Sequence, residues 1–310
     1  GGVRIADNVE ISSTDDAPIL IEGTAGLGGD DDMIGVWIND SSPHTDPEDQ
    51  WTRISSKSGL VTIRGISGGT AAIPATSTGC DGVRLDSNGV RLYSETSADF
   101  EITGTKLVAN TTGNAFATTN AARVISAGSG KVTVNADTIA LSTGTSGCQF
   151  NMGAASVAFV PTTNGRSIEI GGTNASPADT AGTVLGLING ETARVLSGTC
   201  IIGNTLAGPI TVNGPVTMAS NVNLSLVSSG DITQNNTSNH ATTGTLATSG
   251  TGTVKLTSVN GKVKPLPDAL PMAGVLPDVT GDLTFGVGTD LEIMIKGLAS
   301  VANSEDTNGY

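Results

Sequence analysis

The feature that most constrains this chain is a run of short apolar segments separated by turn-forming residues, clearest in residues 122–150. Its apolar segments are Val124–Ile125, Val132–Val134 and Ile139–Leu141, and the residues between them are almost all small or polar. Segments rich in Val, Ile and Thr that are bounded by Gly, Asn, Asp and Ser are typical of strands joined by turns. None is long enough, or spaced correctly, for a helix. The stretch therefore predicts β structure.

Short strands that follow one another in this way are the pattern of a coiled parallel sheet. Each coil leaves apolar side chains exposed above and below it, and only the stacking of further coils buries them. We therefore predict an all-β parallel β-helix, a solenoid with short loop insertions. With strands this short, it would have about fourteen coils of about 22 residues each.

A looser repeat runs through residues 1–121. Its marker is a strand followed by a glycine, and the central residues of the three copies are Ile21, Ile63 and Ile102. Further strand-like segments lie between the copies, so each repeat of about forty residues is expected to hold two coils of about twenty. The glycines are expected at coil corners, where a positive φ is needed.

The chain divides into three predicted parts. Residues 1–121 form an irregular β-helix with repeats of about forty residues, and residues 122–264 form regular coils. Residues 265–310 begin with a proline-rich irregular coil and end in a last strand pair,. We expect the native chain to continue beyond this pair, because an uncapped solenoid end leaves strand edges and apolar residues exposed.

Within the second part, residues 188–196 are predicted to form a short helical insertion. Asn189 would cap it, and Glu191 would stand in its first turn, where a negative charge is favoured by the helix dipole. In the strands, alternation predicts that Thr133 points outward between two inward neighbours. The inward stack is predicted to include Ile125, Val132, Val134, Ile139, Leu141, Ile210, Val212, Leu224 and Leu226.

The net charge of −14 argues against two classes of partner. Nucleic-acid binding requires a basic stripe, and an anionic membrane surface would repel this chain. No apolar segment is long enough to cross a membrane as a helix, so no membrane-spanning segment is predicted,. Acidic chains rich in Gly, Thr and Asn are typical of secreted bacterial surface proteins, in which charge keeps a long rod soluble.

The three cysteines do not form a disulfide framework or a metal site. Three cysteines, an odd number, cannot all pair with one another, and none has the spacing of a metal ligand,. They are Cys80, Cys148 and Cys200. We predict that they are buried and act as small hydrophobic residues.

One acidic cluster is a weak calcium candidate. Asp30, Asp31 and Asp32 follow a glycine, and Ca²⁺ prefers carboxylate oxygens,. The spacing of a known calcium loop is absent, so a solvated turn is the favoured interpretation here. The same holds for the acidic loop at residues 46–49. No cofactor is expected, and calcium stays open as an alternative.

The rival hypothesis is a carbohydrate-active enzyme, because parallel β-helices also include polysaccharide lyases and hydrolases. Such sites need carboxylates that converge on one face. Arg84 and Arg91 occupy similar strand positions near Asp86 and Glu95, and a surface ladder of alternating charge explains this pattern equally well. Trp and Tyr, which would supply sugar platforms, number only four in total. We therefore predict no catalysis.

Two stretches of the chain resemble large bacterial adhesins of the filamentous-haemagglutinin-like type. The first is residues 160–172 (VPTTNGRSIEIGG), with matching positions at 185–187, 191, 194–195, 197–199, 202–203, 208–212 and 224–234. The second, residues 281–295 (GDLTFGVGTDLEIMI), is similar to the G-L-T-x-G-x-x-T-x-L-x-I-x-I strand pair of autotransporter-like passengers. Together they cover about a third of the chain.

This resemblance implies a right-handed parallel β-helix that is exported and acts on the cell surface. The expected role is structural or adhesive: an adhesin, extracellular fibre or surface-layer component, with no catalytic residues supplied by the family. Expected partners are identical subunits or flanking segments of the same long chain, and a cell-surface or glycan receptor. The alternatives are a carbohydrate-active β-helix enzyme and a phage tail-spike segment.

Overall fold

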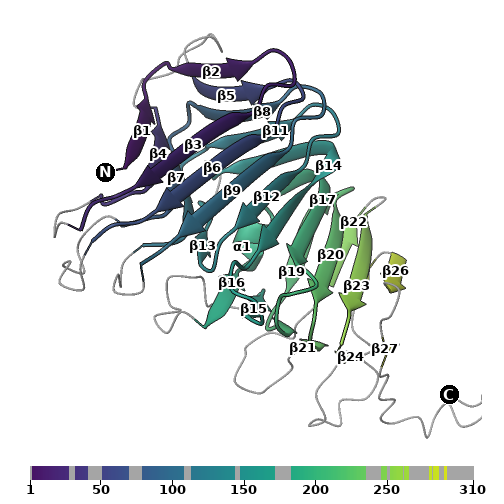
Figure 1. The fold of residues 1–310 in the computed structure, drawn as a ribbon. Helices are drawn as coiled ribbons and strands as arrows, with labels where there is room; N and C mark the ends of the chain where they lie inside the picture. Colours follow the sequence, from purple (N-terminus) through teal and green to yellow (C-terminus); the bar gives the residue numbers. More distant parts are fainter. Residues whose placement is uncertain are drawn as a thin grey trace, which may run out of the picture.

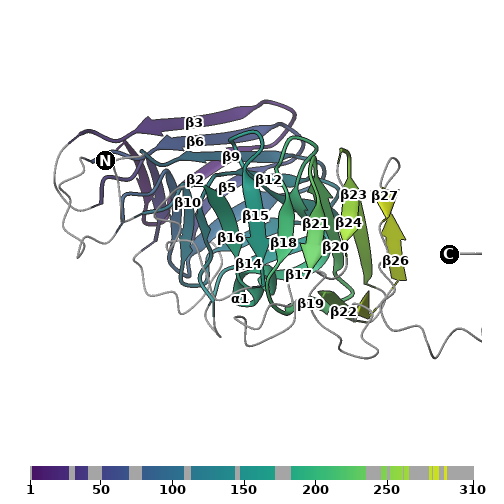
Figure 2. The same cartoon turned by 90° about the horizontal axis from the view of Figure 1, so that it is seen from below.

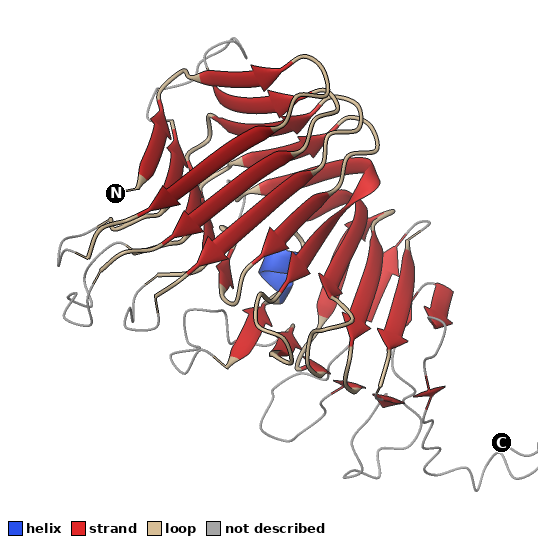
Figure 3. Ribbon diagram, viewed as in Figure 1, coloured by secondary structure: helices blue, strands red, loops and turns tan. Residues whose placement is uncertain are grey.

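In a computed structural model, the regular structure of the described residues is almost entirely β-strand, with one helical turn among them (Figure 3). The structure describes residues 2–27, 32–40, 51–69, 79–107, 113–143, 147–171, 183–234, 246–249, 252–260, 262–264, 279–280, 282–285 and 290–291. In these residues the strands pair in parallel and stack in register, which is the arrangement of a parallel β-solenoid.

The strands of the first half are short except for the last. They are β1 (Val3–Ala6), β2 (Glu10–Ser13), β3 (Ile19–Thr24), β4 (Val36–Asn39), β5 (Thr52–Ser56), β6 (Val61–Ile66), β7 (Val83–Asp86), β8 (Val90–Ser94), β9 (Phe100–Thr105), β10 (Phe116–Thr119), β11 (Arg123–Ser126), β12 (Val132–Asn135), β13 (Ile139–Ala140) and β14 (Gln149–Val160).

The second half contains the helical turn and the remaining strands. They are β15 (Ser167–Ile170), β16 (Val184–Leu187), α1 (Asn189–Thr192), β17 (Val195–Gly203), β18 (Ile210–Val212), β19 (Val216–Ser220), β20 (Asn223–Ser228), β21 (Ile232–Gln234), β22 (Leu246–Ser249), β23 (Thr253–Ser258), β24 (Lys262–Lys264), β25 (Val279–Thr280), β26 (Asp282–Phe285) and β27 (Asp290–Leu291).

The first half stacks in three columns, so that one rung consists of one strand from each (Figure 1). The columns run β1-β4-β7-β10-β13, β2-β5-β8-β11 and β3-β6-β9-β12. Ile21 pairs directly with Ile63, and Ile63 with Ile102. The forty-residue repeat is therefore one rung of three strands, and the prediction of two coils per repeat was wrong. Loops between the strands take up the additional length.

The second and third columns merge at β14, which is 12 residues long. Its first residues pair with β11 and its last residues with β12. Both halves of β14 then pair with β17, and the merged sheet continues through β20, β23 and β26. The inside–outside alternation of β14 is interrupted near Gly153, whose φ is +56°. This irregularity lets one strand replace two, where only short strands were predicted.

The other two sheets of the second half are β16-β15-β18-β21-β24-β27 and β19-β22-β25 (Figure 2). β16 follows β15 in sequence but pairs on the side of β15 opposite to β18. In the described part of the chain, the column β3-β6-β9-β12-β14-β17-β20-β23-β26 has nine rungs, as does the path that enters β14 from β2-β5-β8-β11. The rungs are therefore fewer and longer than the fourteen coils predicted.

The core prediction is confirmed at all but one position. Val132, Val134, Ile139, Leu141, Ile210, Val212, Leu224 and Leu226 are buried in one continuous cluster. Thr133 points outward between its two buried neighbours, as predicted. Ile125 is only half-buried, because the inward positions of β11 are Val124 and Ser126. Two adjacent apolar residues left this register ambiguous in the sequence.

The repeated glycines allow close packing of the backbone instead of supplying a positive φ. Gly23, Gly65 and Gly104 pair in register near the C-terminal ends of β3, β6 and β9, and none of them has a positive φ. A Cβ added at Gly65 would lie 2.0 Å from the carbonyl oxygen of Gly82. The third column thus passes so close to the start of the first that a side chain does not fit.

The predicted helix is present but shorter than expected, because β17 already begins at Val195. Ile188, and not Asn189, is the residue at the N-cap position. The Asn189 Oδ1 atom accepts a hydrogen bond from the Thr217 backbone N–H at 2.7 Å. Residues 265–278, which include the proline-rich segment, lie outside the described residues, as do residues 292–295 of the predicted last strand.

Candidate functional site

Three arginines form a column on the outer face of the second strand column. Arg53 on β5 pairs in register with Arg91 on β8, which pairs with Arg123 on β11. Strand alternation buries their neighbours Ile54 and Leu92 and so directs the arginines outward,. The flanking register positions hold Glu10 on β2 and Gln149 on β14. We call Arg53, Arg91 and Arg123 the arginine column.

Two of the few aromatic residues pack against this column. The Arg91 guanidinium lies 3.7 Å from the centre of the Trp51 ring, and the Arg53 guanidinium lies 4.7 Å from the centre of the Tyr93 ring. Such cation–π contacts stabilise by about 0.5–1 kcal/mol when exposed and by about 2 kcal/mol or more when desolvated. The aromatic rings therefore hold the arginines in place on the sheet.

The three arginines differ in exposure. Arg91 is 5% exposed, and its Nη1 atom donates to the backbone oxygens of Asn88 at 2.8 Å and Val90 at 2.9 Å. The Arg53 side chain is 35% exposed and lies 3.6 Å from Glu95. Arg123 is half-buried and has no ion pair within the described residues. The column thus places two half-buried arginines, each with a buried Nε atom, on either side of a fixed one.

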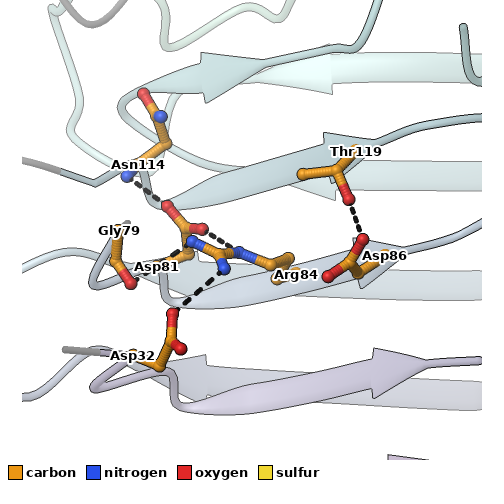
Figure 4. A network of polar contacts seen from close by, with 7 residues as sticks. All are labelled: Asp32, Gly79, Asp81, Arg84, Asp86, Asn114 and Thr119. Carbon is orange, nitrogen blue, oxygen red and sulfur yellow. Dashed lines mark hydrogen bonds and ion pairs between the residues drawn. The ribbon is translucent and has the colours of Figure 1, made fainter. Parts of the chain in front are cut away.

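A second arginine cluster lies on the outer face of the first column (Figure 4). The Arg84 Nε atom donates to Asp81 Oδ2 at 2.5 Å, and Arg84 Nη1 lies 3.4 Å from Asp32 Oδ1. Asp81 Oδ1 also accepts a hydrogen bond from the Asn114 backbone N–H at 2.6 Å. Burial raises the pKa of Asp81, against the lowering effect of Arg84. This cluster fixes the segment that enters β7.

The pairings that the sequence suggested for Arg84 and Arg91 are replaced by others. Asp86 accepts a hydrogen bond from the Thr119 hydroxyl on the next rung (Figure 4). Glu95 pairs with Arg53 on the preceding rung. The two acids thus make their contacts to neighbouring rungs, because strands in register lie only about 4.8 Å apart.

The calcium candidates are not brought together in the part of the chain that the structure describes. Asp32 is engaged by Arg84. Asp30, Asp31 and the acidic loop at residues 46–49 lie outside the described residues. Among the described residues, no group of three or more His, Cys, Asp or Glu side chains could hold a metal ion.

All three cysteines are buried, as predicted, and none of them is in a disulfide. Burial raises the pKa of the Cys200 thiol to about 12, and burial also raises the pKa of the Cys148 thiol. Thiols of this kind are inert, since the thiolate is the reactive form. The cysteines therefore act as core residues.

A buried carboxylate joins the two halves of the solenoid. Glu191 on α1 is 2% exposed, and it accepts hydrogen bonds from the backbone N–H groups of Leu141 at 2.8 Å and Ile188 at 2.9 Å. Leu141 directly follows β13, the last strand of the first column. Burial raises the Glu191 pKa to about 7, although both hydrogen bonds lower it.

A small cavity of about 210 Å³ opens beside the first strand of the first column. Its lining residues are Gly2, Val3, Arg4, Asp32, Ile34 and Trp37. The Arg4 guanidinium lies 4.6 Å from the centre of the Trp37 ring and covers part of it. Arg4 Nε also donates to Asn39 Oδ1 at 3.0 Å, so the cation is already engaged.

Sequence reasoning missed the arginine column, although a signal for it exists. Each arginine begins the pattern Arg, aliphatic, any residue, Ser, and the serines at the ends of these patterns also pair in register. These serines, Ser56, Ser94 and Ser126, are buried. This four-residue pattern marks the strands of the second column. Its copies are unevenly spaced in the sequence, so the pattern is difficult to recognise there.

Comparisons with known proteins give no match: no protein-family model fits the chain, and no curated protein or solved structure shows significant similarity to it. In the described residues, no helix has the length and apolar character needed to cross a membrane.

Proposed function

We propose that this chain is a structural and adhesive segment of a large secreted bacterial surface protein, such as an adhesin, an extracellular fibre or a surface-layer component. The observation that carries the proposal is the unbroken column of nine parallel strands from β3 to β26. Stacking of this kind builds a long, stiff support whose outward side chains are free to vary. The proposal takes the rod to be a right-handed parallel β-helix on the bacterial cell surface, in line with the adhesin-like segments in the sequence.

The use of the acidic side chains supports a role without catalysis. Asp81 and Glu191 accept backbone hydrogen bonds in the interior, and Asp40 and Asp99 accept them from Thr52 and Lys131 on neighbouring segments. Each of these carboxylates braces the backbone at the end of a strand. A glycosidase instead needs two carboxylates that face a shared substrate cleft.

The open edge formed by β1, β2 and β3 supports association with identical subunits. Strands β1, β2 and β3 pair on one side only within the described residues. Val3, Ile11 and Ile19 on these strands are only partly buried against the core. Open strand edges backed by apolar residues favour pairing with another chain.

Sedimentation velocity over a range of protein concentrations tests this proposal. We expect concentration-dependent association that Ile19→Asp weakens, because a charge on an edge strand opposes pairing. Thr133→Asp, on the outer face in the middle of the stack, is the matched control and should associate as the parent does. A monomer at every concentration would contradict end-to-end assembly, and a stable trimer would favour the tail-spike alternative.

The enzyme alternative has its own test. The protein is incubated with neutral and acidic glycans, and the release of new reducing ends is measured. We expect none. Turnover that Glu95→Ala abolishes would replace the structural proposal with a carbohydrate-active enzyme.

A further inference from the structure

We propose that the outer face of β5, β8 and β11 binds an acidic polysaccharide that carries one carboxylate on each sugar ring. The ligand lies along the solenoid axis, with its carboxylates on Arg53 and Arg123 and its rings against Trp51 and Tyr93. This inference rests on the proposed adhesive function and deepens it by naming the class of ligand.

The first argument is the concentration of positive charge. Arg53, Arg91 and Arg123 stand on three successive strands at one register position. Like charges directly opposite one another on neighbouring strands destabilise a sheet. Two acids lie near this column: Glu95 is 3.6 Å from Arg53, and Glu10 on β2 occupies the register position next to Arg53, so three arginines stand against two carboxylates. The column is thus a local excess of positive charge on a chain whose net charge is −14.

The second argument is the chemistry of the arginines. Guanidinium groups bind carboxylates through two parallel hydrogen bonds, and they do so more strongly than neutral donors. Arg53 Nε is buried and Arg53 Nη2 lies 3.6 Å from Glu95, so the paired donors that Arg53 offers to a ligand carboxylate are the N–H groups of its two Nη atoms. Arg91 is fixed beneath Trp51 by its two backbone hydrogen bonds and is a positioning residue for that ring.

The third argument is spacing. Strands in register are about 4.8 Å apart, so Arg53 and Arg123 are about 10 Å apart along the axis. In an extended polysaccharide with two-fold symmetry, the carboxylates of alternate rings face the same side. A ring is about as long as one strand spacing. Alternate carboxylates therefore match Arg53 and Arg123, and the ring between them faces Arg91 and Trp51.

The fourth argument is the pair of aromatic rings. Trp51 and Tyr93 are each half-buried, and they lie within one rung of each other on the face that carries the arginines. Aromatic side chains present an apolar surface with a polar edge, which suits the C–H face of a sugar ring. This combination of cation and ring selects an acidic sugar over a simple inorganic anion.

Calorimetric titration with an oligogalacturonate tests the proposal. The Arg53→Gln/Arg123→Gln double variant should lose at least about tenfold in affinity, since two charge-assisted contacts are removed. Affinity should also fall as salt rises from roughly 50 to 200 mM, because the contacts are ionic. Arg64→Gln is the matched control. This exposed arginine lies on the outer face of β6, pairs with Glu22 at 3.0 Å, and should leave affinity unchanged.

Three further measurements decide between ligand classes. The methyl-esterified form of the same oligomer, which has no charge, should not bind. Arg53→Lys should bind with an affinity between those of the parent and of Arg53→Gln, because lysine keeps the charge but not the paired donors. Tighter binding of a sulfated glycan or of single-stranded nucleic acid would overturn the assignment to carboxylated sugars.

Equal losses of affinity for Arg64→Gln and for the double variant would show that general charge attraction causes binding, and this result would overturn the proposed site. Absence of binding by the parent protein would overturn it as well. Neither outcome bears on end-to-end association, which sedimentation measures separately. Failure of this inference and failure of the proposed structural role are therefore distinguishable.

Discussion

The two halves of the solenoid obey the same stacking rule but use their outer surfaces differently. In the first half, outward positions of the second column carry Arg53, Arg91 and Tyr93. In the second half, a row of outward positions in the merged sheet runs through Ile201 on β17, Ser225 on β20 and Lys255 on β23, with neither an arginine nor an aromatic residue. Both halves bury an aliphatic interior in one continuous cluster. The interior is uniform because stacking demands it, whereas outward positions are free to carry chemistry.

The halves also differ in the length of chain per rung. Ile21, Ile63 and Ile102 occupy successive rungs of the first half, with three strands and their loops in each rung. Cys200, Leu224 and Val254 also occupy successive rungs, but shorter stretches of chain separate them. A rung is thus defined by its strand register and not by its length. This comparison leads to four tests, given from the largest expected effect to the smallest.

The junction between the halves should be the most sensitive point. Phe159 on β14 pairs with Val134 of the first half and with Ile202 of the second. Its fully buried ring also meets Phe150 edge-on, with the two ring centres 5.5 Å apart. Phe159→Ala should lower the free energy of unfolding by about 3–5 kcal/mol through the cavity that it leaves. Denaturant titration measures this loss.

Hydrogen exchange then shows whether the halves unfold together. In Phe159→Ala, we expect faster exchange in β12 and β17, the immediate neighbours of β14, because solenoid rungs are stabilised by their nearest neighbours. Leu20→Ala, at a residue that is 60% exposed, is the control and should change little. Unchanged exchange in both neighbours would contradict the role of the junction.

Close backbone packing should make the first half intolerant of substitution at its glycine ladder. Gly65→Ala places a Cβ 2.0 Å from the Gly82 carbonyl oxygen, so we expect a loss of about 3 kcal/mol as the strands separate,. Gly165→Ala in the second half is the matched control. Its Cβ would meet nothing within 4 Å, but its φ is +74°, so a loss of about 1 kcal/mol is expected,. Equal losses of unfolding free energy for Gly65→Ala and Gly165→Ala, measured by thermal or denaturant unfolding, would refute the packing argument.

Glu191 should make the stability of the junction depend on pH. Its folded-state pKa of about 7 lies above the ordinary value of 4.5, so the folded state binds the proton more tightly than the unfolded state. The stabilisation is fully present below pH 4.5 and is lost as pH rises through 7, with roughly 1 kcal/mol of the loss falling between pH 6 and 8,.

Glu191→Gln provides the test of this dependence. Glutamine cannot ionise, so the free energy of unfolding of the variant should change less between pH 6 and 8. Its single side-chain oxygen can keep only one of the two backbone hydrogen bonds that Glu191 accepts. Unfolding free energies across the pH range measure the effect. An identical slope in the parent and the variant would show that another group titrates.

The smallest effect is expected at an exposed ion pair between rungs. Arg64 lies 3.0 Å from Glu22, and both side chains are about half exposed. Arg64→Ala should change the free energy of unfolding by less than about 1 kcal/mol, and salt should reduce the difference further. A large loss would show that exposed ion pairs on the outer surface of the first half contribute substantially to stability.

Much of the interior was predictable because alternation reports which side chains face inward. The alternation of Val132, Thr133 and Val134 correctly predicted that the two valines are buried and that the threonine points outward. Where two aliphatic residues adjoin, as at Val124 and Ile125, alternation alone could not choose the register. The same physical limit explains the missed long strand β14, since its alternation changes phase at the irregularity near Gly153.

The candidate site was less predictable than the core. The sequence shows each arginine and each aromatic residue, but the column depends on which strands become neighbours. Arg53 and Arg91 are distant in the sequence and come together only through the register of β5 and β8. The loops that separate such strands vary in length, and loop length has little effect on the free energy of closing a loop. No fixed period therefore marks the site.

The sequence by itself determined the parallel β architecture, the aliphatic interior and the burial of the cysteines. These follow from local alternation and composition, which act over a few residues. Only the tertiary structure decided the number of rungs, the merging of two columns at β14 and the in-register alignment of the arginines. Those features depend on pairing between distant strands, and the energy that selects a register is shared among many contacts that no short segment contains.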